Sequence, residues 1–258
     1  MDRQTRAQLA VLESRALQAV CGVVVNSEFT ARELERFGVN GACVRIVVPG
    51  TDAAPLASGP PPEAPLQLLV VAAVIPRKGH EVLVRALDRI RHRPWQCICA
   101  GSLDRDVSYA EGVIAKIESL GLSDRIEFVG ECDRAMLDRL YSAASLFVLP
   151  SYFEGYGMVL TEALARGLPI ISTTGGAIPD VVTAEMGLLV QPGNDEALSE
   201  AIGSLIGNGP AETARGRLMA AAVRYRSRIL SWDAAVEKME NALIGLTPES
   251  SISEEPLA

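Results

Sequence analysis

The sequence predicts an α/β fold: a doubly wound parallel sheet, with a remnant of a second α/β domain in front of it. Six apolar runs alternate with segments that have helical periodicity. The runs are almost continuously apolar, as expected for strands of a parallel sheet that is covered on both faces. The expected strands of this sheet are residues 66–73, 96–100, 125–129, 146–149, 169–172 and 187–190.

The segments between these strands predict helices with one buried face, because their apolar residues recur three and four positions apart. The clearest examples are residues 81–92 and 110–120. A shorter alternation of the same kind precedes the main sheet, with a helix up to residue 19, a strand at 22–25, a helix at 27–37 and a strand at 44–48. Two further helices are expected after the sheet, at 211–228 and 231–244.

A proline-rich stretch separates the two sheet-forming parts of the chain. Five prolines fall within residues 54–65, and such a composition favours an extended spacer over helix or strand. The part before it has two expected strands, too few to bury both faces of a parallel sheet. The predicted organisation is a domain remnant at 1–54, a linker at 55–65, the main domain at 66–210, C-terminal helices at 211–246 and a disordered tail at 247–258.

The overall charge argues against nucleic acid as a partner. Lys and Arg number 24 against 32 Asp and Glu, a formal net charge of -8, whereas nucleic-acid binding neutralises many phosphates with basic side chains. No apolar run reaches the roughly 20 residues that span a bilayer, so we expect a cytoplasmic chain. Five arginines could contact the inner membrane face peripherally or simply form a solvated helix face: Arg215, Arg217, Arg224, Arg226 and Arg228.

No sequence pattern indicates a metal site, and we expect neither a metal nor another cofactor. The two histidines, His80 and His92, lie twelve residues apart, and neither a CxxC pair nor an HExxH motif occurs. The five cysteines are expected to be buried free thiols, with Cys97 and Cys99 on opposite faces of their strand.

The most informative segment follows the strand expected at 146–149. Glu154 and Glu162 lie eight residues apart around a turn that contains two glycines, and a helix is expected to begin at about residue 157. The first turn of a helix has free N–H groups and the positive end of the helix dipole, so it attracts a phosphate. The residues whose backbone could contact that phosphate are Gly155, Tyr156, Gly157, Met158 and Val159. Two carboxylates beside a diphosphate must engage neutral hydroxylated groups, and ribose and a sugar ring provide them. The segment therefore predicts a nucleotide-sugar site.

Two cations are expected opposite the phosphates. Arg77 and Lys78 follow the first strand of the main domain, and loops at the carboxyl ends of parallel strands share one crevice. Lys78 could neutralise a diphosphate as a point charge and Arg77 could bind it as a fork. Turns at Gly101 and Gly130 could contact the nucleotide through their backbone, or could be ordinary strand-to-helix turns. The paired glycines at 175–176 could offer amides to the transferred group.

Together these residues resemble the family-four retaining glycosyltransferases, which use nucleotide-sugar donors and have the GT-B fold. The resemblance is most specific at residues 153–157 and 162–169, includes 76–79, and covers nearly the whole chain. It implies that Glu154 and Glu162 form the family's E-x7-E pair, with Glu154 near the donor sugar and Glu162 on the ribose. It also implies that Lys78 holds the diphosphate.

Three features depart from the family pattern. Ala73 occupies a position that is commonly basic in the family, and Arg77 could replace that residue. Asp180 stands where glutamate is commoner. The chain also has only the last two strands of the N-terminal acceptor domain, so residues 1–54 are expected to be the end of that domain.

The resemblance implies a glycosyltransferase that transfers a sugar from a nucleotide-sugar to an unknown acceptor with retention of configuration, as in polysaccharide biosynthesis. This chain would supply the donor-binding half, with Glu154, Lys78 and Arg77 as its catalytic residues. The departing phosphate would help to deprotonate the acceptor, so the protein would mainly stabilise charge. A separate acceptor-domain chain or a homo-oligomer could complete the enzyme. The first alternative is a noncatalytic nucleotide-sugar-binding subunit, and the second, less favoured one is a nucleotide-sugar epimerase.

Overall fold

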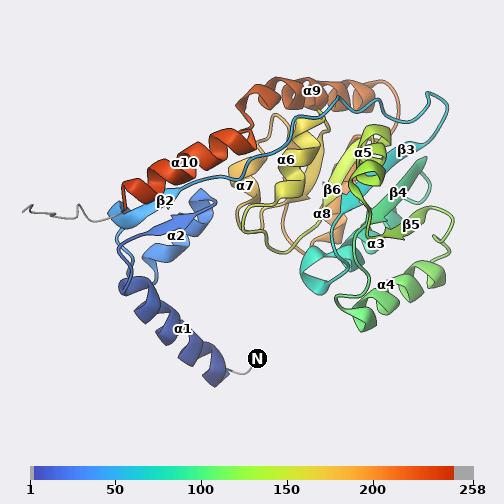
Figure 1. Cartoon of the computed structure of the whole chain (residues 1–258). Coiled ribbons are helices and arrows are strands. Elements are labelled where there is room, and N and C mark those ends of the chain that lie inside the picture. Colours follow the sequence, from blue (N-terminus) through green and yellow to red (C-terminus); the bar gives the residue numbers. More distant parts are fainter. Residues whose placement is uncertain (1–2, 247–258) are drawn as a thin grey trace, which may run out of the picture. The chain divides into compact units, whose positions relative to one another are not determined.

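A computed structural model of the chain describes residues 3–246, so the tail expected at 247–258 lies outside the described residues. The chain divides into two compact units (Figure 1). The smaller unit combines Met1–Gly50 with Leu230–Ala258, and the larger unit is Thr51–Ile229.

Two parallel strands form the centre of the smaller unit, β1 (Val23–Val25) and β2 (Val44–Ile46). Its helical elements are α1 (Arg3–Gln18), α2 (Glu28–Glu35), the short 3-10 helix η1 (Gly41–Cys43) and α10 (Trp232–Ile244). Gly50 explains why α10 belongs to this unit. A Cβ atom on Gly50 would lie 2.5 Å from the Cα of Trp232, so only glycine permits the chain to pass this close to the start of the helix.

The larger unit contains a six-stranded sheet, all of it parallel, in the order β5-β4-β3-β6-β7-β8. The predicted strands are all present, with ends that differ by one or two residues. Their bounds are β3 (Leu66–Val71), β4 (Trp95–Ala100), β5 (Ile126–Gly130), β6 (Leu146–Leu149), β7 (Ile170–Thr173) and β8 (Gly187–Val190). The sheet confirms the predicted α/β fold class.

Helices cover both faces of this sheet. The chain winds one way from β3 to β5 and the other way from β6 to β8, and right-handed crossovers then place the connecting helices on opposite faces. Helix α3 packs against α4 and α8, while α6 packs against α9. The helical elements are η2 (Pro76–Lys78), α3 (His80–Arg89), α4 (Val107–Ser119), α5 (Arg134–Ala143), α6 (Met158–Ala165), α7 (Ile178–Val181), α8 (Asp195–Ser204), α9 (Pro210–Tyr225) and η3 (Arg226–Arg228).

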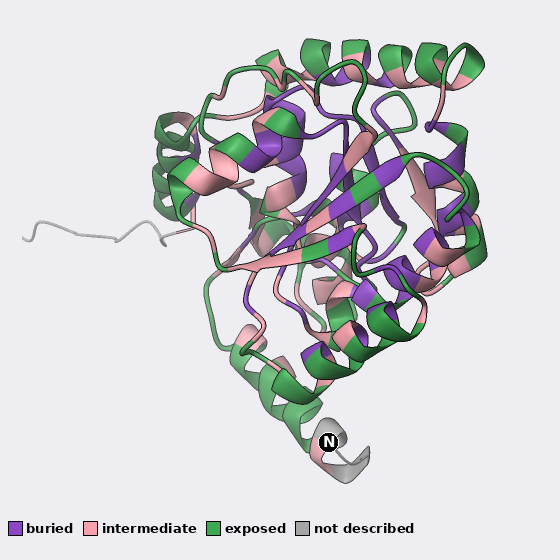
Figure 2. Cartoon of the chain, turned by 90° about the vertical axis from the view of Figure 1, so that its right-hand side faces the viewer, coloured by how far each residue is buried: buried purple, intermediate pink, exposed green. Residues whose placement is uncertain are grey.

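The core of the larger unit lies between the strands and the inner faces of these helices. Every residue of β6 and of β7 is buried, and so are the core-facing residues of α3 (Figure 2). This burial explains why the central strands are apolar without alternation, since both of their faces are covered.

The compact units divide the chain at different places from the predicted domains. The proline-rich stretch 55–65 belongs to the larger unit, because the backbone N–H of Ala57 donates to the carbonyl of Arg166 and that of Ser58 to Ser142. The two C-terminal helices, predicted as one segment, fall in different units. The stretch contains neither helix nor strand, and a turn closes it where the N–H of Ala64 donates to the carbonyl of Pro61. Composition could not predict the hydrogen bonds that fix it to the larger unit.

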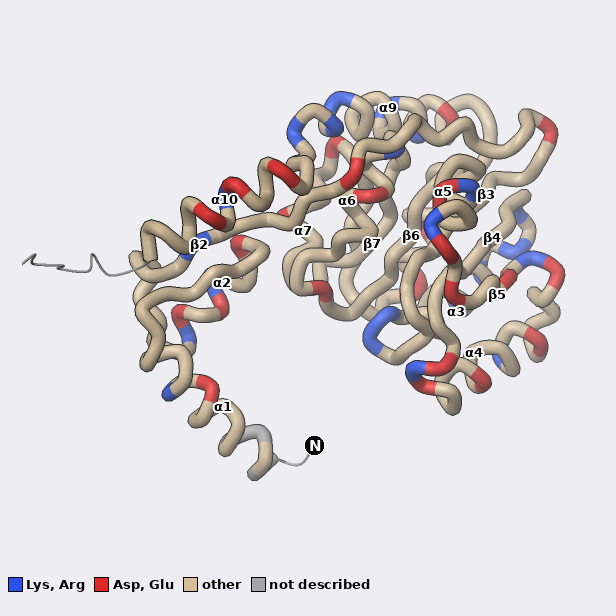
Figure 3. Tube along the Cα trace, in the orientation of Figure 1, with Lys and Arg blue, Asp and Glu red and all other residues tan. Residues whose placement is uncertain are grey.

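Two of the five arginines considered for membrane contact bind the protein's own backbone. Figure 3 shows basic positions along α9 and the turn after it. Arg215 donates to the carbonyl of Leu205 and Arg226 to that of Ala54, each at 2.6 Å. These backbone contacts give both arginines a role in the fold, so no membrane contact is needed to explain them.

The cysteines correct one expectation. Cys97 and Cys99 are buried in β4, but their Sγ atoms lie 4.0 Å apart on the same face of the strand. Side chains two residues apart in a strand point the same way, so the opposite-face prediction was wrong. Cys21 is exposed, so burial does not extend to all five thiols.

Candidate functional site

The predicted site lies where the winding of the sheet reverses. The strands β3 and β6 are neighbours in the sheet, and the chain leaves them for opposite edges. Open α/β sheets bind ligands in the crevice at the carboxyl ends of such a strand pair. The loop after β3 carries Arg77 and Lys78, and the loop after β6 carries Glu154.

Both carboxylate oxygens of Glu154 accept hydrogen bonds. Oε1 accepts from the Nζ of Lys78 and from the Oγ of Ser151, each at 2.6 Å. Oε2 accepts from the guanidinium of Arg77 at 3.3 Å. Glu154 is only 6% exposed, and a buried carboxylate without such partners would be strongly destabilising. The three predicted catalytic side chains therefore form one ion-paired cluster.

The backbone of Glu154 is held as firmly as its side chain. Its carbonyl accepts a 2.8 Å hydrogen bond from the N–H of Ala177, and a Cβ on Gly176 would lie 2.2 Å from the same oxygen. The N–H of Gly175 donates to the Oγ1 of Thr173 at 3.2 Å. The glycine pair thus fixes the Glu154 loop, and the Gly175 amide is not free for a transferred group, contrary to expectation.

The contacts of the two cations differ from those expected. The sequence predicts that Arg77 and Lys78 face phosphates, whereas in this structure they contact Glu154. Two cations and one carboxylate leave the cluster with a net charge of +1. The ammonium group of Lys78 has three N–H donors, and one of them is hydrogen-bonded to Glu154. The cluster can therefore still attract an anion.

The helix that follows this loop begins as predicted, with Gly157 as the residue before its first turn. Gly157 has φ 85° and supplies no capping side chain to α6, a backbone conformation that favours glycine. The amides of Met158 and Val159 belong to the first turn, where a helix has no internal acceptor for them. A Cβ on Gly155 would meet nothing within 4 Å. The start of α6 is thus open to an anionic group.

Tyr156 lies beside this helix start. Its side chain is half-buried, and burial first, followed by the neighbouring Tyr225, raises the pKa of Tyr156 to about 12. The phenol is therefore neutral at physiological pH, and it packs against the hydrophobic core.

The second carboxylate of the predicted pair lies apart from the cluster. Glu162 is on α6 and half-buried, and its Oε2 accepts a 2.9 Å hydrogen bond from the hydroxyl of Tyr141 on α5. Sequence reasoning did not identify Tyr141. The one available signal was its place four residues after Leu137 on an amphipathic helix, which predicts burial but not a polar contact.

The two glycine turns at this edge have different structural roles. Gly101 has φ 148°, and a Cβ there would lie 2.2 Å from the carbonyl oxygen of Ala72. Its N–H donates to the carbonyl of Gly130 at 2.8 Å. That amide is therefore not available for the nucleotide contact that the sequence suggested. Gly130 has φ 72° and open space at its Cβ position. Gly101 is therefore required by a close backbone approach and Gly130 by its turn.

A buried imidazole adjoins the cluster. His80, the first residue of α3, is 1% exposed, and neither Nδ1 nor Nε2 has a hydrogen-bond partner among residues 3–246. Burial first, and then the charge of Lys78, lower the pKa of His80 from 6.5 to about 4. The ring is therefore neutral at pH 7. Its spacing to Leu83 and Val84, which face the core, could have predicted its burial.

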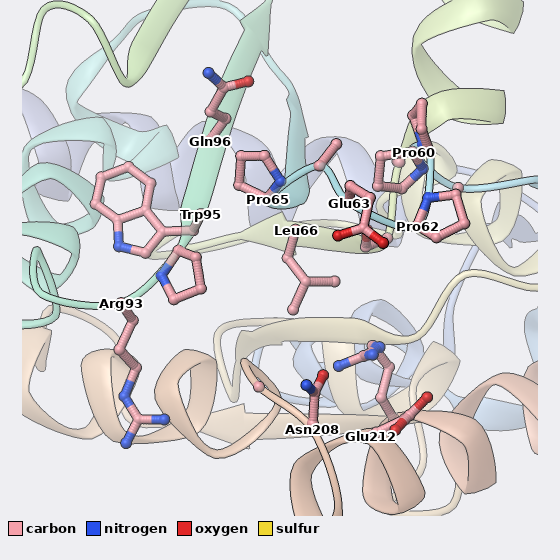
Figure 4. Close-up of a pocket in the computed structure, with 18 of the residues that line it drawn as sticks. Pro60, Pro62, Glu63, Pro65, Leu66, Arg93, Trp95, Gln96, Asn208 and Glu212 are labelled. Carbon is pink, nitrogen blue, oxygen red and sulfur yellow. The ribbon is translucent and has the colours of Figure 1, made fainter.

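A cavity of about 900 Å³ lies at the other end of the sheet (Figure 4). Leu66 and Trp95 line it and begin β3 and β4, so it adjoins the amino ends of the strands. The guanidinium of Arg93, also in its wall, donates to the carbonyls of Gly203 and Ile206 at 3.2 and 3.1 Å. This cavity is separate from the cluster around Glu154, which follows the carboxyl end of β6.

Two further features concern residues 3–246 only. In that range, no group of three or more His, Cys, Asp or Glu side chains is arranged to hold a metal ion. The helices of the same range are all too short or too polar to cross a bilayer.

Residues 56–219, more than half of the chain, match the family described as glycosyl transferases group 1. The chain belongs to this family. It is 32% identical over 209 residues to the D-inositol 3-phosphate glycosyltransferase of Corynebacterium diphtheriae, covering 78% of this chain and 48% of that protein. It is 30% identical over 173 residues to the lipopolysaccharide core biosynthesis mannosyltransferase LpcC of Rhizobium leguminosarum bv. viciae, covering 66% of this chain and 49% of that protein.

Solved structures of related fold include the sucrose-phosphate synthase of Thermosynechococcus elongatus, with a TM-score of 0.81 and 28% identity over 95% of this chain and 63% of that one. Another is Anabaena Alr3699/HepE in complex with UDP and glucose, with a TM-score of 0.80 and 21% identity over 94% of this chain and 67% of that one. These likenesses confirm the GT-B fold, of which this chain is a part. The chain spans about half the length of the curated relatives it matches.

Proposed function

We propose that the chain is the donor-binding half of a glycosyltransferase that transfers a sugar from a nucleotide-sugar to an acceptor with retention of configuration. The observation that carries the proposal is the Lys78–Glu154–Arg77 cluster beside the open start of α6, at the switch point of the sheet. A cationic cluster and a helix start together suit a diphosphate. Family membership supports the same reaction class.

In this proposal the diphosphate binds between Lys78 and the first amides of α6. Glu154, already in contact with Lys78, accepts hydrogen bonds from the donor sugar, and Glu162 accepts them from the ribose. Charge that develops on the departing phosphate is stabilised by Lys78, Arg77 and the dipole of α6. The departing phosphate takes the proton of the acceptor hydroxyl, so the chain needs no general base of its own.

Calorimetric titration of the chain with UDP-, ADP- and GDP-sugars tests donor binding. UDP-glucose is included because a neighbour in fold was solved with UDP and glucose. We expect one nucleotide series to bind, with the diphosphate supplying most of the affinity. Failure of all three series to bind would contradict the proposal. A donor that binds is then incubated with and without candidate acceptors. Analysis of the products distinguishes sugar transfer, binding without turnover and epimerisation.

Transfer with retained configuration supports the enzyme. Donor binding without turnover, alone or with a separate acceptor-domain chain, would indicate a noncatalytic subunit, and release of an epimerised sugar would indicate an epimerase. We further propose that no metal takes part, because the two cations and the helix start already supply positive charge to the phosphates. Donor affinity measured in excess EDTA should equal that in its absence.

A further inference from the structure

Tyr141 is clamped inside the larger unit. It is 1% exposed, and its ring stacks on that of Phe147 with centroids 5.9 Å apart and an interplanar angle of 19°. The guanidinium carbon of Arg166 lies 4.3 Å from the centre of the same ring. These contacts leave the ring one orientation, so the position of its hydroxyl is fixed by packing.

The hydroxyl of Tyr141 meets the carboxylate of Glu162. It lies 2.9 Å from Oε2 and 3.5 Å from the carbonyl of Val159, so its single proton is directed to Glu162. Burial first, and then the nearby Glu162 carboxylate, hold the pKa of Tyr141 well above its usual range. The hydroxyl therefore remains a donor at physiological pH.

Arg166 also holds Glu162. Its guanidinium donates to the backbone carbonyl of Glu162 at 3.0 Å and to the carboxylate of Asp138. The Arg166 side chain is 8% exposed. Both the main chain and one carboxylate oxygen of Glu162 are thus fixed, while Oε1 has no hydrogen-bond partner in the described part of the chain.

We propose that Tyr141 is a positioning residue for the donor site: it holds Oε2 of Glu162 so that Oε1 is presented to the ribose hydroxyls of the nucleotide. The inference rests on the proposed function, in which Glu162 binds ribose. A free glutamate side chain loses rotamer freedom when it binds a ligand, and this loss weakens binding. A glutamate that is already held by Tyr141 avoids most of that loss.

The test compares Tyr141→Phe with the unmodified chain. Phenylalanine keeps the ring, its stack on Phe147 and its contact with Arg166, and removes only the hydroxyl. Affinities are measured by calorimetry for UDP, ADP and GDP and for the 2′,3′-dideoxy analogue of each. For the nucleotide that binds, we expect Tyr141→Phe to weaken the ribose form roughly tenfold and to leave the dideoxy form unchanged.

Two controls isolate the hydroxyl. Tyr109→Phe removes a hydroxyl that accepts from the N–H of Glu81 on α3, and it should change neither affinity. In a Glu162→Ala background, Tyr141→Phe should have no further effect, because the carboxylate that it positions is gone.

Each result bears on a different claim. Equal weakening of the ribose and dideoxy forms, or no weakening of either, would overturn the positioning role of Tyr141. An unmodified chain that binds both forms equally would overturn the ribose role of Glu162, and this inference with it. An unmodified chain that binds no nucleotide would overturn the proposed function itself.

Discussion

The Nζ of Lys78 lies 2.6 Å from Oε1 of Glu154, and the two residues come from loops that follow neighbouring strands, 76 positions apart in sequence. Their side chains are largely covered, at 14% and 8% exposed. The pair therefore holds the two loops together at the switch point of the sheet. It also couples the group expected to bind phosphate to the group expected to bind the sugar.

Replacing Lys78 with alanine should weaken diphosphate binding roughly tenfold or more, because a partly buried charge-assisted hydrogen bond is lost. Calorimetry with the free nucleoside diphosphate measures this directly. Lys116→Ala is the matched control, since Lys116 is an exposed residue near the end of α4. The assignment fails if Lys78→Ala binds as tightly as the control.

Replacing Glu154 with glutamine should separate the sugar from the nucleotide. The amide keeps the size of the side chain and an oxygen that can accept from Lys78, but it removes one negative charge from the cluster. Affinity for the nucleoside diphosphate should stay equal or rise, because the neutral amide attracts Lys78 and Arg77 less strongly than the carboxylate does and leaves more of their charge for the phosphates. Turnover of the nucleotide-sugar should fall by about 100-fold. A variant with normal turnover would show that the charge of Glu154 plays no part in the reaction.

The strands, the sheet class and the loops of the site could be predicted from sequence, because periodicity and strand-end position are local signals. The strand order brought Arg77, Lys78 and Glu154 together as expected. Their pairing could not be predicted, since it depends on how side chains from separate loops meet. The occupied amide of Gly101 was missed for the same reason: its partner, the carbonyl of Gly130, lies at the end of another strand, β5.

The buried His80 should make the protein less stable in mild acid. Its pKa in the folded state is about 4, below the unfolded value of 6.5, so the unfolded chain binds a proton that the folded chain excludes. The stability that this neutral ring contributes is fully present above pH 6.5 and is lost as pH falls toward 4. The effect on the free energy of unfolding reaches at most about 3 kcal/mol.

Urea unfolding between pH 7 and 4.5 measures this dependence. His80→Leu should show a shallower decline in stability with falling pH than the unmodified chain. His92→Gln should keep the full decline, because His92 is exposed and the variant leaves the buried ring of His80 in place. If the His80 and His92 variants decline in parallel, the imidazole of His80 does not titrate as described.

Gly101 and Gly112 should respond in opposite ways to alanine. At Gly101 the backbone has φ 148°, and a Cβ would lie 2.2 Å from the carbonyl oxygen of Ala72 and 2.4 Å from its carbonyl carbon. Alanine there must push the loops after β3 and β4 apart, so Gly101→Ala should lower the free energy of unfolding by about 2 kcal/mol or more.

Gly112 lies inside α4, where a Cβ would meet nothing within 4 Å. Gly112→Ala should therefore raise stability by about 0.5–1 kcal/mol through helix propensity. Thermal and urea unfolding of the two variants measure both changes, and equal stability of Gly101→Ala and the unmodified chain would mean that the two loops do not approach this closely.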